Sequence, residues 1–259
     1  MTLDPAKIIE VFFIALQGLP VTLFMVVVSI LIALPFGFIM AVINVRNVPI
    51  ASQACRVYIS FMRGVPIIVQ IFLIYNSLPS LLNVVFSTLG IPFDVFAVST
   101  VFYAIVVFSL SEIAILAEVF RAAINGIDEG QLEAAESAGL TLTQSYVRII
   151  VPQAFGAAIP VLGNAVTDLI KTTSLAFSMA IADVMGIAKV EAAASLDYID
   201  SYLAVFFIYL ILVLIFENLF KVLDKKLNFH KRTEADRKPR TLRVPRLQKA
   251  AHATRKEHP

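Results

Sequence analysis

The sequence predicts an all-α membrane protein, and three observations lead to that class. Hydrophobic residues make up 59% of the 259 residues and charged residues only 15%, whereas soluble domains contain about 45–50% apolar residues. Five apolar runs each approach the roughly 20 residues that a helix needs to cross a bilayer. Most of the lysines and arginines lie between these runs or in a basic tail. The chain is therefore expected to consist mostly of membrane-spanning helices.

The predicted elements follow in chain order. Residues 5–17 place apolar side chains at helical spacing, which predicts a short amphipathic helix at the membrane interface. The five spanning helices are predicted at about residues 21–45, 66–84, 95–120, 153–181 and 202–220. A polar insert at residues 121–151 separates the third helix from the fourth. These boundaries divide the chain into an extracytoplasmic N-terminal or interfacial segment (1–19), a membrane domain (20–223) and a basic cytoplasmic tail (224–259).

The orientation is predicted from the positive charges, because cytoplasmic loops of membrane proteins carry an excess of Lys and Arg. The tail from Lys221 onward contains 13 Lys and Arg against 4 acidic residues. The connections that share its side of the membrane contain five arginines: Arg46, Arg56, Arg63, Arg121 and Arg148. The connections on the other side contain only Lys7 and Lys189. We therefore expect the N-terminus outside, and the polar insert and the C-terminus in the cytoplasm.

Several kinds of chemistry are absent from the sequence. Cys55 is the only cysteine, which excludes an intramolecular disulfide and a Cys-rich metal site. No glycine begins the phosphate-binding pattern G-x-x-x-x-G-K-[ST], so we expect no nucleotide or other cofactor in this chain. The basic tail has no aromatic residue after Phe229, which favours a solvated cytoplasmic extension, or one that lies against anionic lipid headgroups, over nucleic-acid binding. The membrane part has no histidine for catalysis or metal binding, because all three are in the tail: His230, His252 and His258.

The polar insert contains residues at a recognisable spacing: Glu133, Ala134, Ala135, Gly139, Ile149 and Pro152. Ionised side chains are costly to place in lipid, so the insert is expected to protrude from the membrane. Asp128 and Thr141 each begin a segment with the spacing of a capping box. Two short helices are therefore predicted, and Gly139 is expected to supply a left-handed turn between them.

This spacing resembles the EAA loop of ABC-transporter permease subunits, with Val151 where a leucine is usual. The chain is similar to the polar amino-acid permeases of the histidine, glutamine and cystine type over about residues 16–228. Thr172 stands where that family often has Asp or Asn, and Ile115 where an aromatic residue is frequent. The matching residues outside the loop pattern are Arg63, Gly64, Val65, Pro66, Glu118, Arg121, Gly130, Gln131, Gln153, Asn164, Lys171, Thr173, Ser174 and Leu175.

The resemblance implies a five-helix type I ABC permease core in the inner membrane of a bacterium, with the EAA loop at about residues 127–152. It implies that this loop docks on an ATPase subunit through Glu133, Ala134, Ala135, Gly139 and Pro152. The implied partners are two ATPase subunits that bind ATP and Mg, a second permease subunit, an extracytoplasmic solute-binding protein and membrane lipid. The chain itself is then no enzyme, because its partner hydrolyses ATP.

Ionisable residues inside the predicted spans are the candidates for contact with a substrate, because such groups tend to face a polar cavity or one another. Glu112 and Glu118 lie in the third span, and Asp168 and Lys171 in the fourth. An amino acid needs partners for its ammonium and carboxylate groups. The candidate substrate-binding residues are Glu118, Asn164, Asp168, Lys171, Thr172, Thr173 and Ser174.

Other interpretations of these charges are open at this point. Asp168 and Lys171 are three residues apart and could form a structural pair on one helix face, or a gating contact with a partner subunit. Glu118 and Arg121 have the same spacing and could form an interfacial ion pair.

The function that the resemblance implies is inward transport of a polar amino acid by an ABC importer. Cystine, glutamine, glutamate and the basic amino acids all stay open as substrates, as does the identity of the second permease chain. The first alternative is a secondary transporter or channel driven by an ion gradient. An intramembrane enzyme is the second alternative, and it is disfavoured because no membrane histidine accompanies a serine and no paired nucleophile motif occurs.

Overall fold

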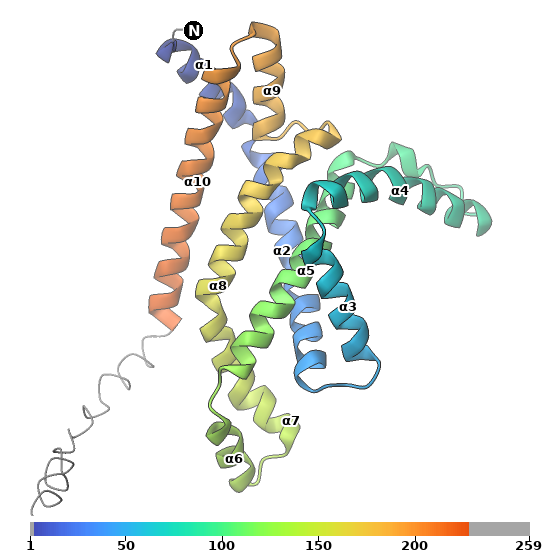
Figure 1. Cartoon of the computed structure of the whole chain (residues 1–259), viewed down its shortest axis with the longest axis vertical. Coiled ribbons are helices and arrows are strands. Elements are labelled where there is room, and N and C mark those ends of the chain that lie inside the picture. The colour runs from blue at the N-terminus through green and yellow to red at the C-terminus, as the bar shows by residue number, and fades with distance from the viewer. Residues whose placement is uncertain (1–2, 228–259) are drawn as a thin grey trace, which may run out of the picture.

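The computed structural model describes residues 3–227, and within these residues the chain forms only helices and their connections. Figure 1 shows their arrangement. In chain order they are α1 (Pro5–Ala15), η1 (Leu16–Gly18), α2 (Leu19–Val45), α3 (Ala51–Gly64), α4 (Ile67–Thr88), η2 (Val95–Ala97), α5 (Thr100–Asn125), α6 (Glu129–Ser137), α7 (Leu142–Ser145), η3 (Tyr146–Ile150), α8 (Val151–Thr172), η4 (Thr173–Met179), α9 (Val184–Ser195) and α10 (Tyr198–Leu227). The tail predicted at residues 224–259 lies mostly outside the described residues.

Five stretches of the described residues are long and apolar enough to span a membrane: Pro5–Val45, Ile67–Thr88, Thr100–Asn125, Leu142–Met179 and Tyr198–Lys226. Each overlaps one of the five spans predicted from the sequence. The all-α membrane class with five spanning helices is therefore confirmed.

Helix α5 is the centre of the bundle. In its most apolar 18-residue window 61% of the residues are buried, against 17–33% in the other four spans. It packs most extensively on α2, and also on α8, α3 and α4. Phe108 and Phe120 of α5 are fully buried. A side chain that α5 presents to its neighbours is thus enclosed by protein rather than by lipid.

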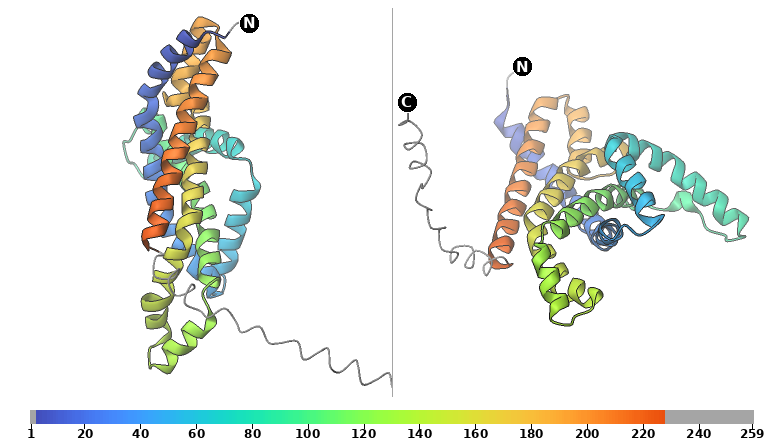
Figure 2. Two further views of the ribbon diagram at one scale, coloured as in Figure 1. Left: turned by 90° about the vertical axis from the view of Figure 1, so that its left-hand side faces the viewer. Right: turned by 60° about the horizontal axis from the view of Figure 1, so that its bottom comes forward.

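The first span is longer than a bilayer is thick. The stretch Pro5–Val45 has 41 residues, about 60 Å as a helix, whereas the hydrocarbon core is about 30 Å thick. Part of this stretch must therefore extend beyond the hydrocarbon. Its first section, α1, packs against α9 and α10 at the end of the molecule opposite α6 and α7 (Figures 1 and 2). Lys7 of α1 contacts Glu191 of α9, with 2.9 Å between Nζ and Oε1.

Helix α4 projects sideways from the bundle (Figure 1). Only 17% of its most apolar window is buried, and large apolar side chains along it are exposed, among them Phe72, Leu73, Leu81 and Val84. Exposed apolar surface on this scale is typical of contact with lipid or with another membrane subunit.

The third span begins at Thr100 rather than at about residue 95, because Ser99 caps α5 by accepting a hydrogen bond from the Val101 amide at 3.3 Å. The fourth spanning stretch reaches Met179, close to the predicted end at about residue 181. Within it, the α-helix α8 ends at Thr172 and the chain tightens into η4. The left-handed conformation of Ala180 then turns the chain into α9.

Hydroxyl groups account for the tightening after Thr172. Thr173 donates to the Ile170 carbonyl at 2.6 Å, Ser174 to the Lys171 carbonyl at 2.6 Å, and Ser178 to the Leu175 carbonyl at 2.7 Å. Each bond runs three residues back, which is the spacing of a 3₁₀ turn. Such local bonds offer the backbone an alternative to the α-helical ladder.

Candidate functional site

The segment predicted as the EAA loop (residues 127–152), called the polar loop below, runs from the end of α5 into the first turn of α8. It projects from one end of the molecule as two short helices, α6 and α7 (Figures 1 and 2). Gly139 lies between them with a φ of +82°, so the predicted left-handed turn is confirmed. The Gly139 amide donates to the Glu136 carbonyl at 2.9 Å, and the Leu140 amide donates to the Ala135 carbonyl at 3.1 Å. These two bonds form a Schellman motif, which closes α6 and fixes the direction in which α7 leaves.

The two predicted capping boxes have different outcomes. At Thr141 both bonds are present: its hydroxyl accepts from the Gln144 amide at 3.3 Å, and the Gln144 side chain accepts from the Thr141 amide at 2.9 Å. The box predicted at Asp128 is wrong. Asp128 accepts from the Gly130 amide at 2.8 Å, and the Gln131 side chain instead faces Gln153, with 3.5 Å between their side-chain atoms.

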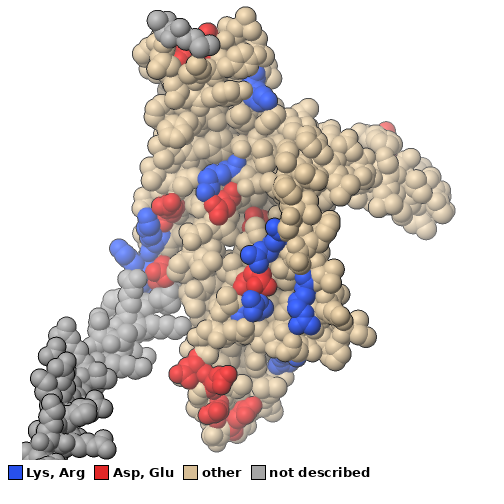
Figure 3. Space-filling model, viewed as in Figure 1, with Lys and Arg blue, Asp and Glu red and all other residues tan. Residues whose placement is uncertain are grey.

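The loop presents mainly acidic groups at its surface. Glu133, Ala134, Gly139 and Pro152 are exposed, whereas Ala135 is a buried residue of α6. The sequence has no Lys or Arg between Arg121 and Arg148, and Figure 3 shows acidic groups gathered at this end of the molecule. The acidic residues of α6 and its cap are Asp128, Glu129, Glu133 and Glu136. A partner that docks here must therefore match a negatively charged surface.

The loop is firmly connected to the spanning helices. The guanidinium carbon of Arg46, at the end of α2, lies 4.8 Å from the ring centre of Tyr146 in η3. Beyond η3, Phe155 of α8 contacts Phe38 of α2 and Phe120 of α5, with ring centres 5.2 and 5.0 Å apart. These contacts join η3 and the first turns of α8 to α2 and α5.

A second candidate region is the exposed face of α8. Asn164, Asp168 and Lys171 are exposed and follow the spacing of one helical stripe. Lys171 and Asp168 form an ion pair with 2.6 Å between Nζ and Oδ1, and their side chains are 55% and 66% exposed. The expected pairing is thus present. In the single chain the pair lies open on the surface.

The three hydroxyl residues predicted for substrate contact bond within their own helix. Thr172 donates to the Asp168 carbonyl at 2.8 Å, and Thr173 and Ser174 donate three residues back as described above. Thr173 is fully buried. Once its proton is used in this way, a hydroxyl can offer a ligand only its acceptor capacity.

Glu118 lies in a separate charged cluster. Its Oε2 is 2.7 Å from Nη2 of Arg121 and 3.9 Å from Nη1 of Arg63 on α3. Glu118 and Arg63 line a pocket of about 540 Å³ between α5 and the α3–α4 turn, which also includes Gln70 and Ser111. Neither Asp168 nor Lys171 lines this pocket. The predicted substrate residues therefore fall into two groups, and Glu118 forms the ion pair with Arg121 that its spacing allows.

Asn164 faces α10 as well as the exposed stripe of α8. It lines a small pocket of about 280 Å³ together with Glu217 and Lys221 of α10. Glu217 and Lys221 form an ion pair at 3.2 Å. Polar groups of α10 thus continue the charged surface that begins at Asp168 and Lys171.

Two buried polar residues, Gln70 and Glu112, belong neither to the predicted substrate-binding residues nor to the predicted ATPase-docking residues. Gln70 is 3% exposed, and its Nε2 donates to the carbonyls of Met62 and Val65 at 2.7 and 2.8 Å, which fixes the turn between α3 and α4. Glu112 of α5 is 4% exposed, and its Oε2 has no hydrogen-bond partner among the described residues. In the sequence the only signal for either is a polar residue inside an apolar run.

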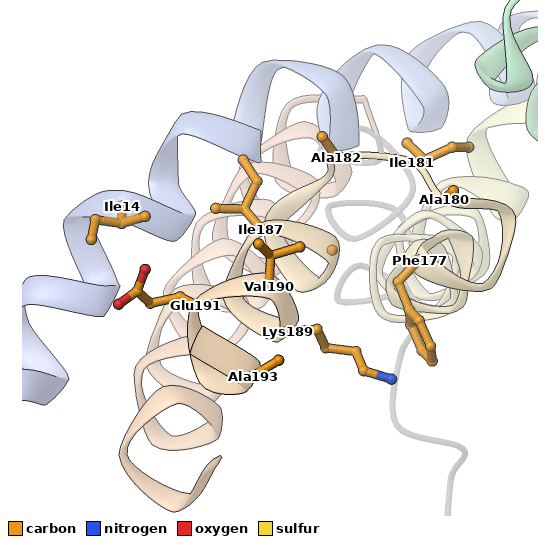
Figure 4. A pocket seen from close by; sticks show the side chains of 11 residues that line it. Ile14, Phe177, Ala180, Ile181, Ala182, Ile187, Lys189, Val190, Glu191 and Ala193 are labelled. Atoms are coloured by element: carbon orange, nitrogen blue, oxygen red, sulfur yellow. The ribbon is translucent and has the colours of Figure 1, made fainter. Parts of the chain in front are cut away.

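The opposite end of the molecule has a pocket of about 600 Å³ between α1, η4 and α9. Figure 4 shows Lys189 extended toward the ring of Phe177 and Glu191 turned toward α1. The Lys189 ammonium lies 3.7 Å from the centre of that ring. The pocket is otherwise lined mostly by apolar side chains. No group of His, Cys, Asp and Glu within residues 3–227 has the geometry to hold a metal ion.

Comparisons with known proteins agree with this geometry. The sequence matches the family described as "Binding-protein-dependent transport system inner membrane component" over residues 33–229. It is 39% identical over 232 residues to the probable amino-acid permease protein YxeN of Bacillus subtilis (strain 168), covering 90% of this chain and 99% of the relative. It is 36% identical over 209 residues to the L-cystine transport system permease protein TcyL of the same organism, covering 81% of this chain and 85% of the relative.

A solved structure shows the same fold. A chain from a crystal structure of an amino acid ABC transporter with histidines superposes on this chain with a TM-score of 0.74 at 25% sequence identity. The match covers 87% of this chain and 100% of that one.

The five spanning helices and the projecting polar loop define a membrane subunit of the type I ABC permease fold. The chain belongs to the family of binding-protein-dependent transport system inner membrane components. It is accordingly a multi-pass protein of the bacterial inner membrane and a permease subunit, without enzymatic activity of its own. Family membership favours this interpretation over the ion-gradient-driven transporter and the intramembrane enzyme.

Proposed function

We propose that this chain forms the translocation path of an importer that moves a polar amino acid into the cytoplasm, driven by ATP hydrolysis in separate ATPase subunits. The observation that carries the proposal is the polar loop, whose Schellman motif at Gly139 and capping box at Thr141 hold two exposed helices in a fixed arrangement. The names of the relatives YxeN and TcyL support an amino acid as substrate, with cystine as one candidate.

The proposed direction of coupling follows the contacts of the loop. ATPase subunits that bind ATP and Mg dock on Glu133, Ala134, Ala135, Gly139 and Pro152. Their closure moves the loop, and the aromatic contacts of Tyr146 and Phe155 carry that movement into α2, α5 and α8. The face of α8 that bears Asn164, Asp168 and Lys171 then opens alternately to the two sides of the membrane.

The proposed assembly has two permease chains, two ATPase subunits and an extracytoplasmic solute-binding protein. The exposed charges of Asp168 and Lys171 support a second permease chain, because charged side chains facing lipid are unfavourable. The solute-binding protein docks at the end that carries α1 and α9, opposite the polar loop (Figure 1). This places the N-terminus outside the cell and the loop in the cytoplasm, as the distribution of Lys and Arg predicts.

Affinity purification tests the assembly. The tagged chain, expressed in its own bacterium, is expected to co-purify with an ATPase, and uptake of a labelled polar amino acid is expected to require both proteins. Gly139→Val should abolish uptake while insertion in the membrane persists. The matched control is Gly64→Ala, where φ is not positive and no atom lies within 4 Å of an added Cβ. Uptake that continues without any ATPase would refute the proposal.

The orientation has a separate test. Cys55 is a poor reporter because it is buried, so it is first replaced by alanine. Single cysteines are then introduced at two exposed positions at opposite ends, Thr143 of α7 and Asp197 before α10. A membrane-impermeant maleimide added to intact cells is expected to label position 197 and not position 143. The reverse pattern would invert the proposed topology.

A further inference from the structure

Asp183 is a buried carboxyl group that the proposed transport mechanism does not use. It is fully buried and lies outside the spanning stretches, between Met179 and Tyr198. Its Oδ1 accepts a hydrogen bond from the Gly186 amide at 2.7 Å and so caps the N-terminus of α9. Its Oδ2 has no hydrogen-bond partner among the described residues, and none of the ion pairs within residues 3–227 includes Asp183. One oxygen thus holds α9, while the other is unsatisfied in the protein interior.

The backbone next to this carboxyl group joins α9 to the start of α2. The Val184 amide, the first of α9, donates to Oγ1 of Thr22 at 3.3 Å, and Thr22 is fully buried. Gly18 lies so close to this backbone that an added Cβ would collide with Asp183 and Val184. The connection that precedes the junction turns at Ala180, where φ is +56°. The first turn of α9 is therefore held against α2 directly after a left-handed turn of the chain.

The elements that pack on α9 provide no counter-charge for an ionised Asp183. Helix α2 and the turns η1 and η4 contain no titratable side chain. On α10, Tyr209 interacts with Asp183, but its hydroxyl makes no hydrogen bond among the described residues. The other charged groups of α1, α9 and α10 at this end make contacts elsewhere: Lys7 with Glu10 and Glu191, Lys189 with the Phe177 ring, and Asp200 with the Asp4 amide. A buried carboxylate without a counter-charge is unfavourable.

The protonation of Asp183 is therefore coupled to the position of α9. Burial raises the pKa of Asp183 from 3.8 to about 6. When α9 leaves the junction, the carboxyl group meets water and its pKa returns to the ordinary value. The closed junction thus binds a proton that the open junction releases, so opening becomes more favourable as the pH rises from about 4 to about 6 and levels off above that.

We propose that Asp183 is a proton-sensitive latch for α9: the protonated carboxyl group keeps the helix seated against α2, and ionisation loosens it. Helix α9 and residues 180–182 form walls of the pocket of about 600 Å³ at this end of the molecule (Figure 4). Movement of α9 therefore changes the shape of that pocket, at the end that the proposed orientation places outside the cell. The latch goes beyond the proposed function and does not depend on it.

Hydrogen exchange of the α9 amides, in the full-length chain purified in detergent, measures the opening. Each observed rate is divided by the intrinsic exchange rate at the same pH, which gives the opening equilibrium. For the unmodified chain we expect the opening of α9 to increase about tenfold between pH 5 and pH 7. Asp183→Asn and Asp183→Ser keep an acceptor for the cap but cannot ionise, so this increase should disappear. The matched control is Asp197→Asn, on an exposed side chain at the same end, which should keep it.

Thr22→Ala separates the latch from the packing of the junction. It removes the acceptor of the Val184 amide, so the opening should increase by a similar factor at each pH while the tenfold change persists. Equal opening at pH 5 and pH 7 in the unmodified chain would overturn the latch, and so would an opening that continues to rise above pH 7. The same tenfold change in α6 would also overturn it, because the response would then be global. If both Asp183 variants fold and keep the change, another group causes it and the assignment of Asp183 is wrong.

Discussion

Replacing Gly139 is the most direct test of how the polar loop works. At this position φ is +82°, and no heavy atom lies within 4 Å of the point that a Cβ would occupy. Within the chain a substitution therefore meets no steric obstacle from neighbouring groups, and its effect on the loop comes from the backbone conformation. A residue other than glycine pays about 1–2 kcal/mol for the left-handed region, and a β-branched residue pays more.

This cost has a measurable consequence. The Schellman bonds at Gly139 and Leu140 hold α6 and α7 in the arrangement that a partner recognises. A penalty of about 1–2 kcal/mol lowers the population of that arrangement, and with it the apparent affinity for the ATPase, by roughly 5- to 30-fold. Gly139→Ala should show this loss, Gly139→Val a larger one, and Gly139→Asn the smallest, because asparagine tolerates the left-handed region.

The assay is a titration of the purified permease variants with their ATPase, read out as binding and as ATP hydrolysis in reconstituted vesicles. The expected order of affinity is Gly, then Asn, Ala and Val. Equal affinity for all four proteins would refute the claim that the turn sets the docking geometry. A loss in every variant with no difference between Asn and Val would show that the loop requires the small size of glycine rather than its conformation.

Three further predictions concern stability. Thr141→Ala should destabilise the capped turn of the loop by about 1 kcal/mol, seen as faster amide exchange in α7, whereas Thr143→Ala on the same turn should not; equal exchange in the two would contradict the role of the cap. Gly18→Ala should lower the thermal stability in detergent, because an added Cβ meets the backbone of Asp183, while Gly64→Ala, in open space, serves as its control. Burial raises the pKa of Asp183 from 3.8 to about 6, so the folded chain binds more protons than the unfolded chain between these values and its stability falls as the pH rises through that window. Asp183→Asn should remove this slope, and an unchanged slope would assign it to another group.

The local features of the fold could be predicted from the sequence because their causes are local. The turn at Gly139 and the capping box at Thr141 depend on residues within four positions of one another. The ion pair of Asp168 and Lys171 is set by its spacing on α8. The five spans could be predicted from the length of the apolar runs, because a helix needs about 20 apolar residues to cross the hydrocarbon core of a bilayer.

The end of the α-helix within the fourth span could not be predicted in the same way. Hydropathy does not distinguish a side chain that faces lipid from one that is buried in protein, so the apolar residues of η4 extended the fourth predicted span beyond Thr172. What ends α8 there is the set of hydroxyl bonds from Thr173 and Ser174 to carbonyls three residues back. Several spacings could satisfy such hydroxyls, and the tertiary contacts of η4 with α9 select one of them.

The positions of the membrane charges depended on contacts that no local pattern contains. Glu118 acquires Arg63 as a second partner only because α3 packs against α5. Glu112 is buried because α5 is the centre of the bundle. The substrate residues predicted from the sequence therefore belong to two places. Asn164, Asp168 and Lys171 share one face of α8, whereas Glu118 lies in a separate charged cluster on α5.

The exposed charges also show what the single chain leaves incomplete. Figure 3 shows basic and acidic groups close together on the face between α10 and α3. Among the ion pairs of the described residues, Lys171 pairs with Asp168, and Arg63 and Arg121 pair with Glu118. Each ionised group costs about 2.5–3.5 kcal/mol at the centre of a spanning helix, and an exposed ion pair returns at most about 1 kcal/mol. A chain that turned this face to lipid would be strongly destabilised. The face is therefore expected to meet a second permease chain and the water-filled path between the two, so that the substrate site is a property of the assembled transporter to which each chain contributes one charged wall.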